Sequence, residues 1–119
     1  MSRNPAQPLP GTTLCLLDDI PQAGAKGFVF REGEALFAGF ILREGSQVRG
    51  FIDRCPHNGM PLSALPNQYL TRDGRFIICS GHGALFMKGD GACVAGPCEG
   101  EVLETWVVTV KDDLTVIAA

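Results

Sequence analysis

Short apolar runs, rich in β-branched and aromatic residues, alternate along this chain with connectors of glycine, proline and charged residues. The runs cover residues 13–17, 27–30, 35–42, 47–52, 68–71, 76–79, 101–110 and 114–117. Runs of this length and composition predict β-strands. The connectors 31–34 and 43–46 are charged and contain glycine, and 72–75 contains Asp-Gly, as hairpin turns often do. We therefore expect an antiparallel meander up to residue 52 and further hairpins beyond it.

The pattern contains no internal repeat and no amphipathic helical stretch, so it predicts an all-β fold. The length of 119 residues indicates one domain, residues 1–119. We expect an antiparallel β base domain from residues 13–52 and 101–118, closed as one sheet system, with an inserted subdomain at about 53–100. Residues 1–12, which are rich in proline and polar side chains, read as a loose leader. In the last long run, Trp106, Val108 and Val110 are expected in the core.

The charge balance argues against several partners. The formal net charge is −3, and the ten Lys and Arg residues form no basic cluster. This disfavours nucleic acid and anionic membranes as partners. No apolar run approaches the roughly 20 residues of a membrane span, and the first residues lack a signal-peptide pattern. We expect a soluble, cytoplasmic protein; the sequence leaves its oligomeric state open and favours a monomer.

Both histidines of the chain occur beside cysteines, in Cys55-Pro-His57 and in Cys79-Ser-Gly-His82. Each short segment can present one thiolate and one imidazole to metal. Two thiolates on one iron and two imidazoles on the other is the ligand set of a Rieske-type [2Fe–2S] cluster. Cys55 and Cys79 would then bind the first iron, and His57 and His82 the second.

Two other readings use the same four residues. Cys₂His₂ is also a tetrahedral zinc set, which would make the chain a zinc-stabilised binding module. A zinc finger usually pairs Cys with Cys and His with His, whereas here the order is Cys-His and then Cys-His. Four unconnected core residues would require the matching spacings to arise by chance.

The residues around the ligands strengthen the cluster interpretation. His57 is followed by Asn-Gly-Met-Pro-Leu, His82 is followed by Gly-Ala-Leu-Phe, and residues 91–100 form a Gly- and Pro-containing segment. Over about residues 51–110 the chain resembles the Rieske ferredoxins and the Rieske domains of ring-hydroxylating oxygenases. The segment 91–100 resembles the third loop that covers a Rieske cluster. The gap of residues 58–78 is longer than in short bacterial ferredoxins, which implies an enlarged hairpin or loop at 65–75.

The resemblance implies a Rieske-like fold, one [2Fe–2S] cluster per chain and a soluble electron carrier. Its partners would be a flavoprotein reductase and a terminal oxygenase. The alternative is a small electron-transfer subunit similar to those of nitrite reductases. Catalysis by the chain itself is not expected, because both histidines serve the cluster and no nucleotide-binding loop is present.

The resemblance also bears on positions beside the ligands. In respiratory Rieske proteins a disulfide joins positions that here are Met60 and Gly81, so that bridge is absent. The serine and tyrosine that donate hydrogen bonds to the cluster there correspond to Ala84 and Phe86, which implies a low potential.

Three cysteines lie outside the predicted ligand set: Cys15, Cys93 and Cys98. A reducing cytoplasm disfavours structural disulfides. We expect Cys93 and Cys98 to be small buried residues near the third loop, with a redox-labile pair as the alternative.

Overall fold

The computed structural model describes residues 4–56, 59–63, 67–81 and 83–119. Apart from a single 3₁₀ turn, η1 (Leu17–Asp19), its regular elements are all β-strands. The strands are β1 (Thr13–Leu16), β2 (Ala25–Glu32), β3 (Ala35–Glu44), β4 (Gln47–Ile52), β5 (Phe76–Ile78), β6 (Leu85–Met87), β7 (Cys93–Ala95), β8 (Thr105–Trp106), β9 (Val108–Val110) and β10 (Thr115–Ala118). The described residues contain no helix with the length and apolar character needed to span a bilayer. The all-β prediction is confirmed.

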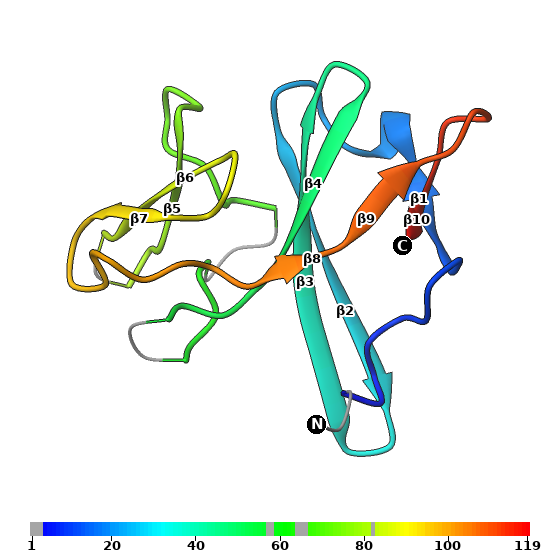
Figure 1. The fold of residues 1–119 in the computed structure, drawn as a ribbon, viewed down its shortest axis with the longest axis horizontal. Coiled ribbons are helices and arrows are strands. Elements are labelled where there is room, and N and C mark those ends of the chain that lie inside the picture. Colours follow the sequence, from blue (N-terminus) through cyan, green and yellow to red (C-terminus); the bar gives the residue numbers. More distant parts are fainter. Residues whose placement is uncertain (1–3, 57–58, 64–66, 82) are drawn as a thin grey trace.

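The strands form three antiparallel sheets, in the orders β1-β10-β9, β2-β3-β4-β8 and β5-β6-β7. Figure 1 shows the β5-β6-β7 sheet on one side of the long β2-β3-β4 strands and the β1-β10-β9 sheet on the other. The strands at the two ends of the chain pair, with Thr13 opposite Ile117. They form a separate sheet, however, so the expectation of one closed sheet system is wrong.

The predicted run 101–110 is divided between two of these sheets. β8 pairs with β4, whereas β9 pairs with β10. Val107, between them, is exposed. The chain therefore crosses from one sheet to the other at Val107. As expected, Trp106 is buried, while Val108 and Val110 are partly buried against the same core.

β3 is buried on both faces, which explains its almost continuous apolar sequence. Phe37 and Ile41 belong to the core shared with β1 and β10, where Trp106 packs edge-on against Phe37. Phe40 and Leu42 point the other way, into a second core. The second core also contains residues of the inserted segment, namely Cys55, Leu62, Tyr69, Ile77, Cys79, Ala84, Phe86, Cys93 and Cys98. β3 thus contributes side chains both to the core of the base and to the core that contains residues of segment 53–100.

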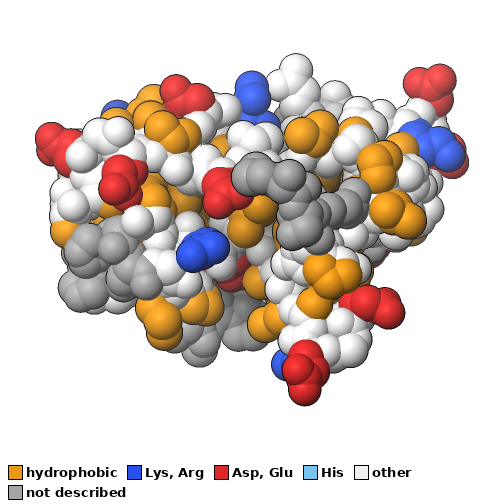
Figure 2. All heavy atoms as spheres, turned by 60° about the horizontal axis from the view of Figure 1, so that its bottom comes forward, with side chains coloured by type: hydrophobic (Ala, Val, Ile, Leu, Met, Phe, Trp, Pro, Cys, Tyr) orange, Lys and Arg blue, Asp and Glu red, His pale blue; other side chains and the backbone are white. Residues whose placement is uncertain are grey.

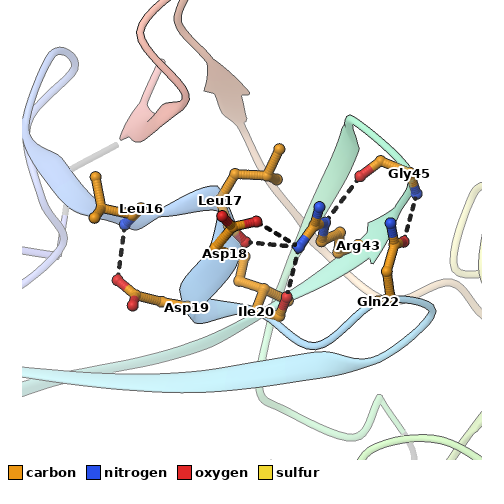
Figure 3. Close-up of polar contacts among 8 residues, drawn as sticks. All are labelled: Leu16, Leu17, Asp18, Asp19, Ile20, Gln22, Arg43 and Gly45. Atoms are coloured by element: carbon orange, nitrogen blue, oxygen red, sulfur yellow. Dashed lines mark hydrogen bonds and ion pairs between the residues drawn. The ribbon is translucent and has the colours of Figure 1, made fainter.

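Arg43 fixes the connection between β1 and β2 to the end of β3 (Figure 3). Its Nη1 donates to the carbonyl oxygens of Leu17 (3.3 Å) and Ile20 (3.1 Å) and pairs with the Asp18 carboxylate at 3.3 Å. Its Nε donates to the Gly45 carbonyl oxygen at 2.8 Å. The Arg43 side chain is only 12% exposed, and these acceptors pair its Nε and Nη1 groups.

The described part of the predicted leader, residues 4–12, is packed onto the base. Ala6 is buried, and Asn4 Nδ2 donates to the Leu36 carbonyl oxygen at 3.0 Å. The backbone N–H of Ala118 donates to the Thr12 carbonyl oxygen at 2.9 Å. Small apolar and turn-forming residues in this segment thus make contacts that its polar composition does not reveal.

Candidate metal centre

The loop after β4 places Cys55 at the start of a closed turn. The Cys55 N–H donates to the Met60 carbonyl oxygen at 2.8 Å, and the Gly59 N–H donates back to the Cys55 carbonyl oxygen at 2.7 Å. Gly59 has a φ of 73°, a conformation that glycine adopts without steric cost. His57 and Asn58 belong to this loop but lie outside the described residues.

The loop between β5 and β6 repeats this arrangement. The Cys79 N–H donates to the Ala84 carbonyl oxygen and the Gly83 N–H donates to the Cys79 carbonyl oxygen, both at 2.9 Å. The φ of Gly83 is 72°. In both loops, the backbone of the cysteine is thus hydrogen-bonded to the backbone of the residues four and five positions later. His82, like His57, lies outside the described residues.

The two loops are tied to each other through Leu62. Its carbonyl oxygen accepts from the Ser80 N–H at 2.7 Å and from the Ser80 hydroxyl at 3.0 Å. Its own N–H donates to Asp53 Oδ1 at 2.7 Å. Cys55 and Cys79, which are 1% and 2% exposed, belong to the same buried core. The relative position of the two predicted thiol ligands is therefore set by hydrogen bonds on either side of Leu62.

Asp53 and Tyr69 form hydrogen bonds that hold the first loop in place. The Tyr69 hydroxyl donates to Asp53 Oδ2 at 3.1 Å, and the Tyr69 ring stacks on Phe40 with centroids 4.3 Å apart. Burial raises the pKa of Asp53, although the hydrogen bonds from Leu62 and Tyr69 oppose this shift. Burial, together with the Asp53 charge, also raises the pKa of Tyr69. Sequence reasoning missed both residues; the only signal was a carboxylate two positions before Cys55.

The third loop lies against the second. Gly96 follows β7 with a φ of 98°, and a Cβ built on it would lie 2.7 Å from Ala84 Cα. The Glu101 N–H donates to the Cys98 carbonyl oxygen and the Cys93 N–H donates to the Glu101 carbonyl oxygen, both at 2.9 Å. The expected third loop therefore reaches the loop that carries Cys79.

The remaining cysteines occupy two environments. Cys93 and Cys98 are buried, as expected, with their Sγ atoms 3.1 Å apart. Cys15 is partly buried on β1, and burial raises the pKa of its thiol.

The donor set fits an iron–sulfur centre as far as the described residues reach. Two buried thiols on matching loops could supply the soft ligands of one iron, and each loop has in its sequence a histidine that could bind the other. Within the described residues, which include neither histidine, no group of three His, Cys, Asp or Glu side chains could hold a metal ion. The part of the chain that is described thus offers no competing metal site.

The fold and the paired cysteine loops define a small all-β metal-binding protein. Residues 12–112 match the family model of the Rieske [2Fe-2S] domain, and the chain belongs to this family. No curated protein matches the chain by sequence. A [2Fe–2S] cluster, one per chain, is the cofactor of the family.

Solved structures agree with this assignment. A chain in the complex of reduced oxygenase and oxidised ferredoxin of carbazole 1,9a-dioxygenase has 29% identity and a TM-score of 0.67, with coverage of 90% of this chain and 99% of that one. The carbazole 1,9a-dioxygenase ferredoxin of Nocardioides aromaticivorans IC177 has 20% identity and a TM-score of 0.65, with coverage of 92% and 98%. A putative nitrite reductase NADPH small subunit has 22% identity and a TM-score of 0.59, with coverage of 91% and 97%. The chain is an electron carrier of the ferredoxin type.

Proposed function

We propose that Cys55 and Cys79 bind one iron of the cluster and that His57 and His82 bind the other. The observation that carries this assignment is the repeated backbone arrangement of the two loops, which presents one buried cysteine each. When bound, the cluster supplies one-electron exchange. The residues of this chain hold the thiols in place, keep water from them and orient the loops.

We further propose that the chain carries electrons singly from a flavoprotein reductase to a terminal oxygenase. The resemblance to the chain from the carbazole 1,9a-dioxygenase complex supports electron transfer to an oxygenase. Met60, next to the first loop, is 60% exposed, and Val102 is also exposed. Exposed apolar side chains of this kind suit the small, short-lived contacts of redox partners. On the face shown in Figure 2, Lys and Arg side chains are scattered rather than gathered into a patch.

The absence of hydroxyl groups at Ala84 and Phe86 favours a low potential. Both side chains are fully buried and apolar, so neither donates a hydrogen bond toward the ligand loops. Donors to cluster sulfur stabilise the more negative reduced state. We expect a potential in the lower part of the Rieske range of about −150 to +300 mV, suited to electrons from a flavin.

The ligand assignment is tested with His57→Ala and Cys79→Ala, with Cys15→Ala as a control cysteine far from the loops. The wild type and Cys15→Ala should contain about two iron and two sulfide per chain and give a Rieske-type paramagnetic signal on reduction. Both ligand variants should lose that signal. A wild type with zinc in place of iron, or a His57→Ala variant with an unchanged signal, would overturn the assignment.

The electron acceptor is tested by mixing the reduced protein with an oxidised Rieske oxygenase component in a stopped-flow instrument. Reoxidation within seconds, and product formation once a flavoprotein reductase and NADH are added, would support an oxygenase partner. A second candidate, the small subunit of a nitrite-reductase-like enzyme, is favoured by the similarity to the putative nitrite reductase subunit. Co-purification with a large catalytic subunit, and no reoxidation by the oxygenase, would favour this second candidate.

A further inference from the structure

The face of β3 that carries Phe40 and Leu42 continues beyond the part that the inserted segment covers. Side chains two positions apart on a strand point to the same face, so Leu36 and Ala38 share this face with Phe40. Phe40 is fully buried, whereas Leu36 is 48% exposed. Val29 of β2 pairs with Ala38, lies on the same face and is 63% exposed. Part of an apolar sheet face is thus open to solvent.

This open part of the sheet borders the first ligand loop. A hollow of about 350 Å³ lies between them, lined by Leu36 of β3 and by Arg54, Gly59 and Pro61 of the loop, among others. Met60, between two of these loop residues, is 60% exposed. Neighbouring exposed apolar side chains of this size are typical of interaction sites. We call the exposed residues around the hollow the hairpin–loop surface: Val29, Leu36, Arg54 and Met60.

Arg54 supplies the positive charge of the hairpin–loop surface. Its side chain is exposed, and a Cβ built on Gly59 would lie 3.6 Å from its Nε, so Arg54 lies beside the turn of the loop. Asp53 is the other charged residue that lines the hollow, and its carboxylate already accepts hydrogen bonds from Leu62 and Tyr69. Within the described part of the chain, Arg54 forms no ion pair. Its planar guanidinium can therefore pair with a carboxylate of another molecule.

We propose that the hairpin–loop surface docks the terminal oxygenase, with Arg54 pairing with a carboxylate and Val29 and Leu36 contacting apolar side chains around it. The assignment rests on the proposed function, in which an oxygenase accepts the electron. A partner seated here lies against the loop that carries Cys55, so docking brings it to the candidate centre. The chain as a whole has a net charge of −3, so this local positive charge orients an acidic partner toward one surface.

Stopped-flow reoxidation of the reduced protein by an oxidised Rieske oxygenase component tests the charged contact. Arg54→Gln should lower the second-order rate constant about three- to tenfold at low ionic strength. The loss should shrink as salt is added, because salt screens the charge pair. Arg54→Lys keeps the charge and should recover part of the rate. The control Arg49→Gln removes an exposed arginine that lines a different hollow, beside Val108, and should leave the rate close to that of the wild type.

A second pair of variants tests the apolar contact. Leu36→Gln should slow reoxidation about two- to fivefold, and added salt should not restore the rate, because no charge is involved. The control Leu16→Gln changes a leucine that is 56% exposed on β1, in a different sheet, and should not slow reoxidation.

Reduction potentials and iron and sulfide contents are measured for each variant. Lower rates with unchanged potentials would support docking at this surface, whereas a fall in rate that a changed potential explains would overturn the proposal. Equal rates for Arg54→Gln and Arg49→Gln, with both clusters intact, would also overturn it. A loss confined to reduction by the flavoprotein reductase would contradict the assignment to the oxygenase. If Arg54→Gln does not retain its cluster, Leu36→Gln decides. A wild type that the oxygenase component does not reoxidise would contradict the proposed function and this assignment with it.

Discussion

Gly96→Ala tests whether contact between the second and third loops holds the candidate centre together. Gly96 has a φ of 98°, and a Cβ at this position would lie 2.7 Å from Ala84 Cα and 3.1 Å from Ala84 Cβ. The nearest obstacle is backbone, so a side-chain rotation cannot relieve it. The chain offers a matched control in Gly100, whose φ is 94° but whose Cβ would meet nothing within 4 Å.

The two substitutions share one cost and differ in another. An alanine held in such a conformation costs about 1–3 kcal/mol, offset by about 0.4–1 kcal/mol from the stiffer unfolded chain. Gly100→Ala should therefore destabilise the protein by roughly 1–2 kcal/mol. Gly96→Ala adds an overpacking term of about 1–3 kcal/mol, because the two loops must separate. The difference between the variants measures the contact alone.

Urea unfolding followed by the fluorescence of Trp106 supplies the measurement, since this buried residue is the one tryptophan of the chain. With a slope of about 1.5 kcal/mol/M, the two variants should have midpoints about 0.7–2 M urea apart. The visible absorption of the cluster should also fade faster in Gly96→Ala than in Gly100→Ala. Equal midpoints and equal rates of fading would show that the third loop does not press on Ala84.

Two further substitutions test contacts outside this interface. Tyr69→Phe removes the hydrogen bond to the partly buried Asp53 and should lower the free energy of unfolding by about 1–3 kcal/mol; an unchanged urea midpoint would refute the role of this bond. Asp113 has a lowered pKa because it accepts hydrogen bonds from Thr115, so its stabilising contribution is present above pH 3.8 and is lost as the pH falls through its lower folded-state pKa. The melting temperature of Asp113→Ala should therefore approach that of the wild type as the pH falls from 5 to 3. A melting-temperature difference from the wild type that stays constant over this range would contradict the reasoning. The same pH dependence in the control Asp112→Ala would also contradict it.

Much of the strand pattern could be predicted because its signals are local. The run 47–52 coincides with β4, and the charged, glycine-containing connectors 31–34 and 43–46 lie at the hairpin turns on either side of β3. These elements depend on turn residues and β-rich composition, which a sequence displays directly. The division of 101–110 is different. Val107 and Val108 are adjacent apolar residues that break the alternation, and only the pairing of β8 and β9 with different sheets explains them.

The candidate site also has parts that the sequence reveals and parts that it does not. The four predicted ligands were recognisable because each pair is close in sequence, although the structure describes only Cys55 and Cys79. The residues that position the loops could not be recognised, because their partners are distant. Leu62 meets Ser80 from the other loop, and Tyr69 reaches Asp53 only after the chain has turned back. Such contacts depend on the fold, so they produce no recognisable spacing of residues in the sequence.

The two-sided burial of β3 has a consequence for how the centre is kept rigid. The inserted segment 53–100 shares its core with the base, because Phe40 of β3 and Phe51 of β4 belong to the same buried cluster as its apolar residues. Phe40 stacks on Tyr69, and Tyr69 in turn bonds to Asp53, which holds Leu62 between the loops. The sheet that contains β3 is thus connected through three contacts to Leu62, which links the two cysteine loops. An electron carrier benefits from this connection, because ligands fixed by the protein in both oxidation states need little rearrangement when the electron arrives or leaves.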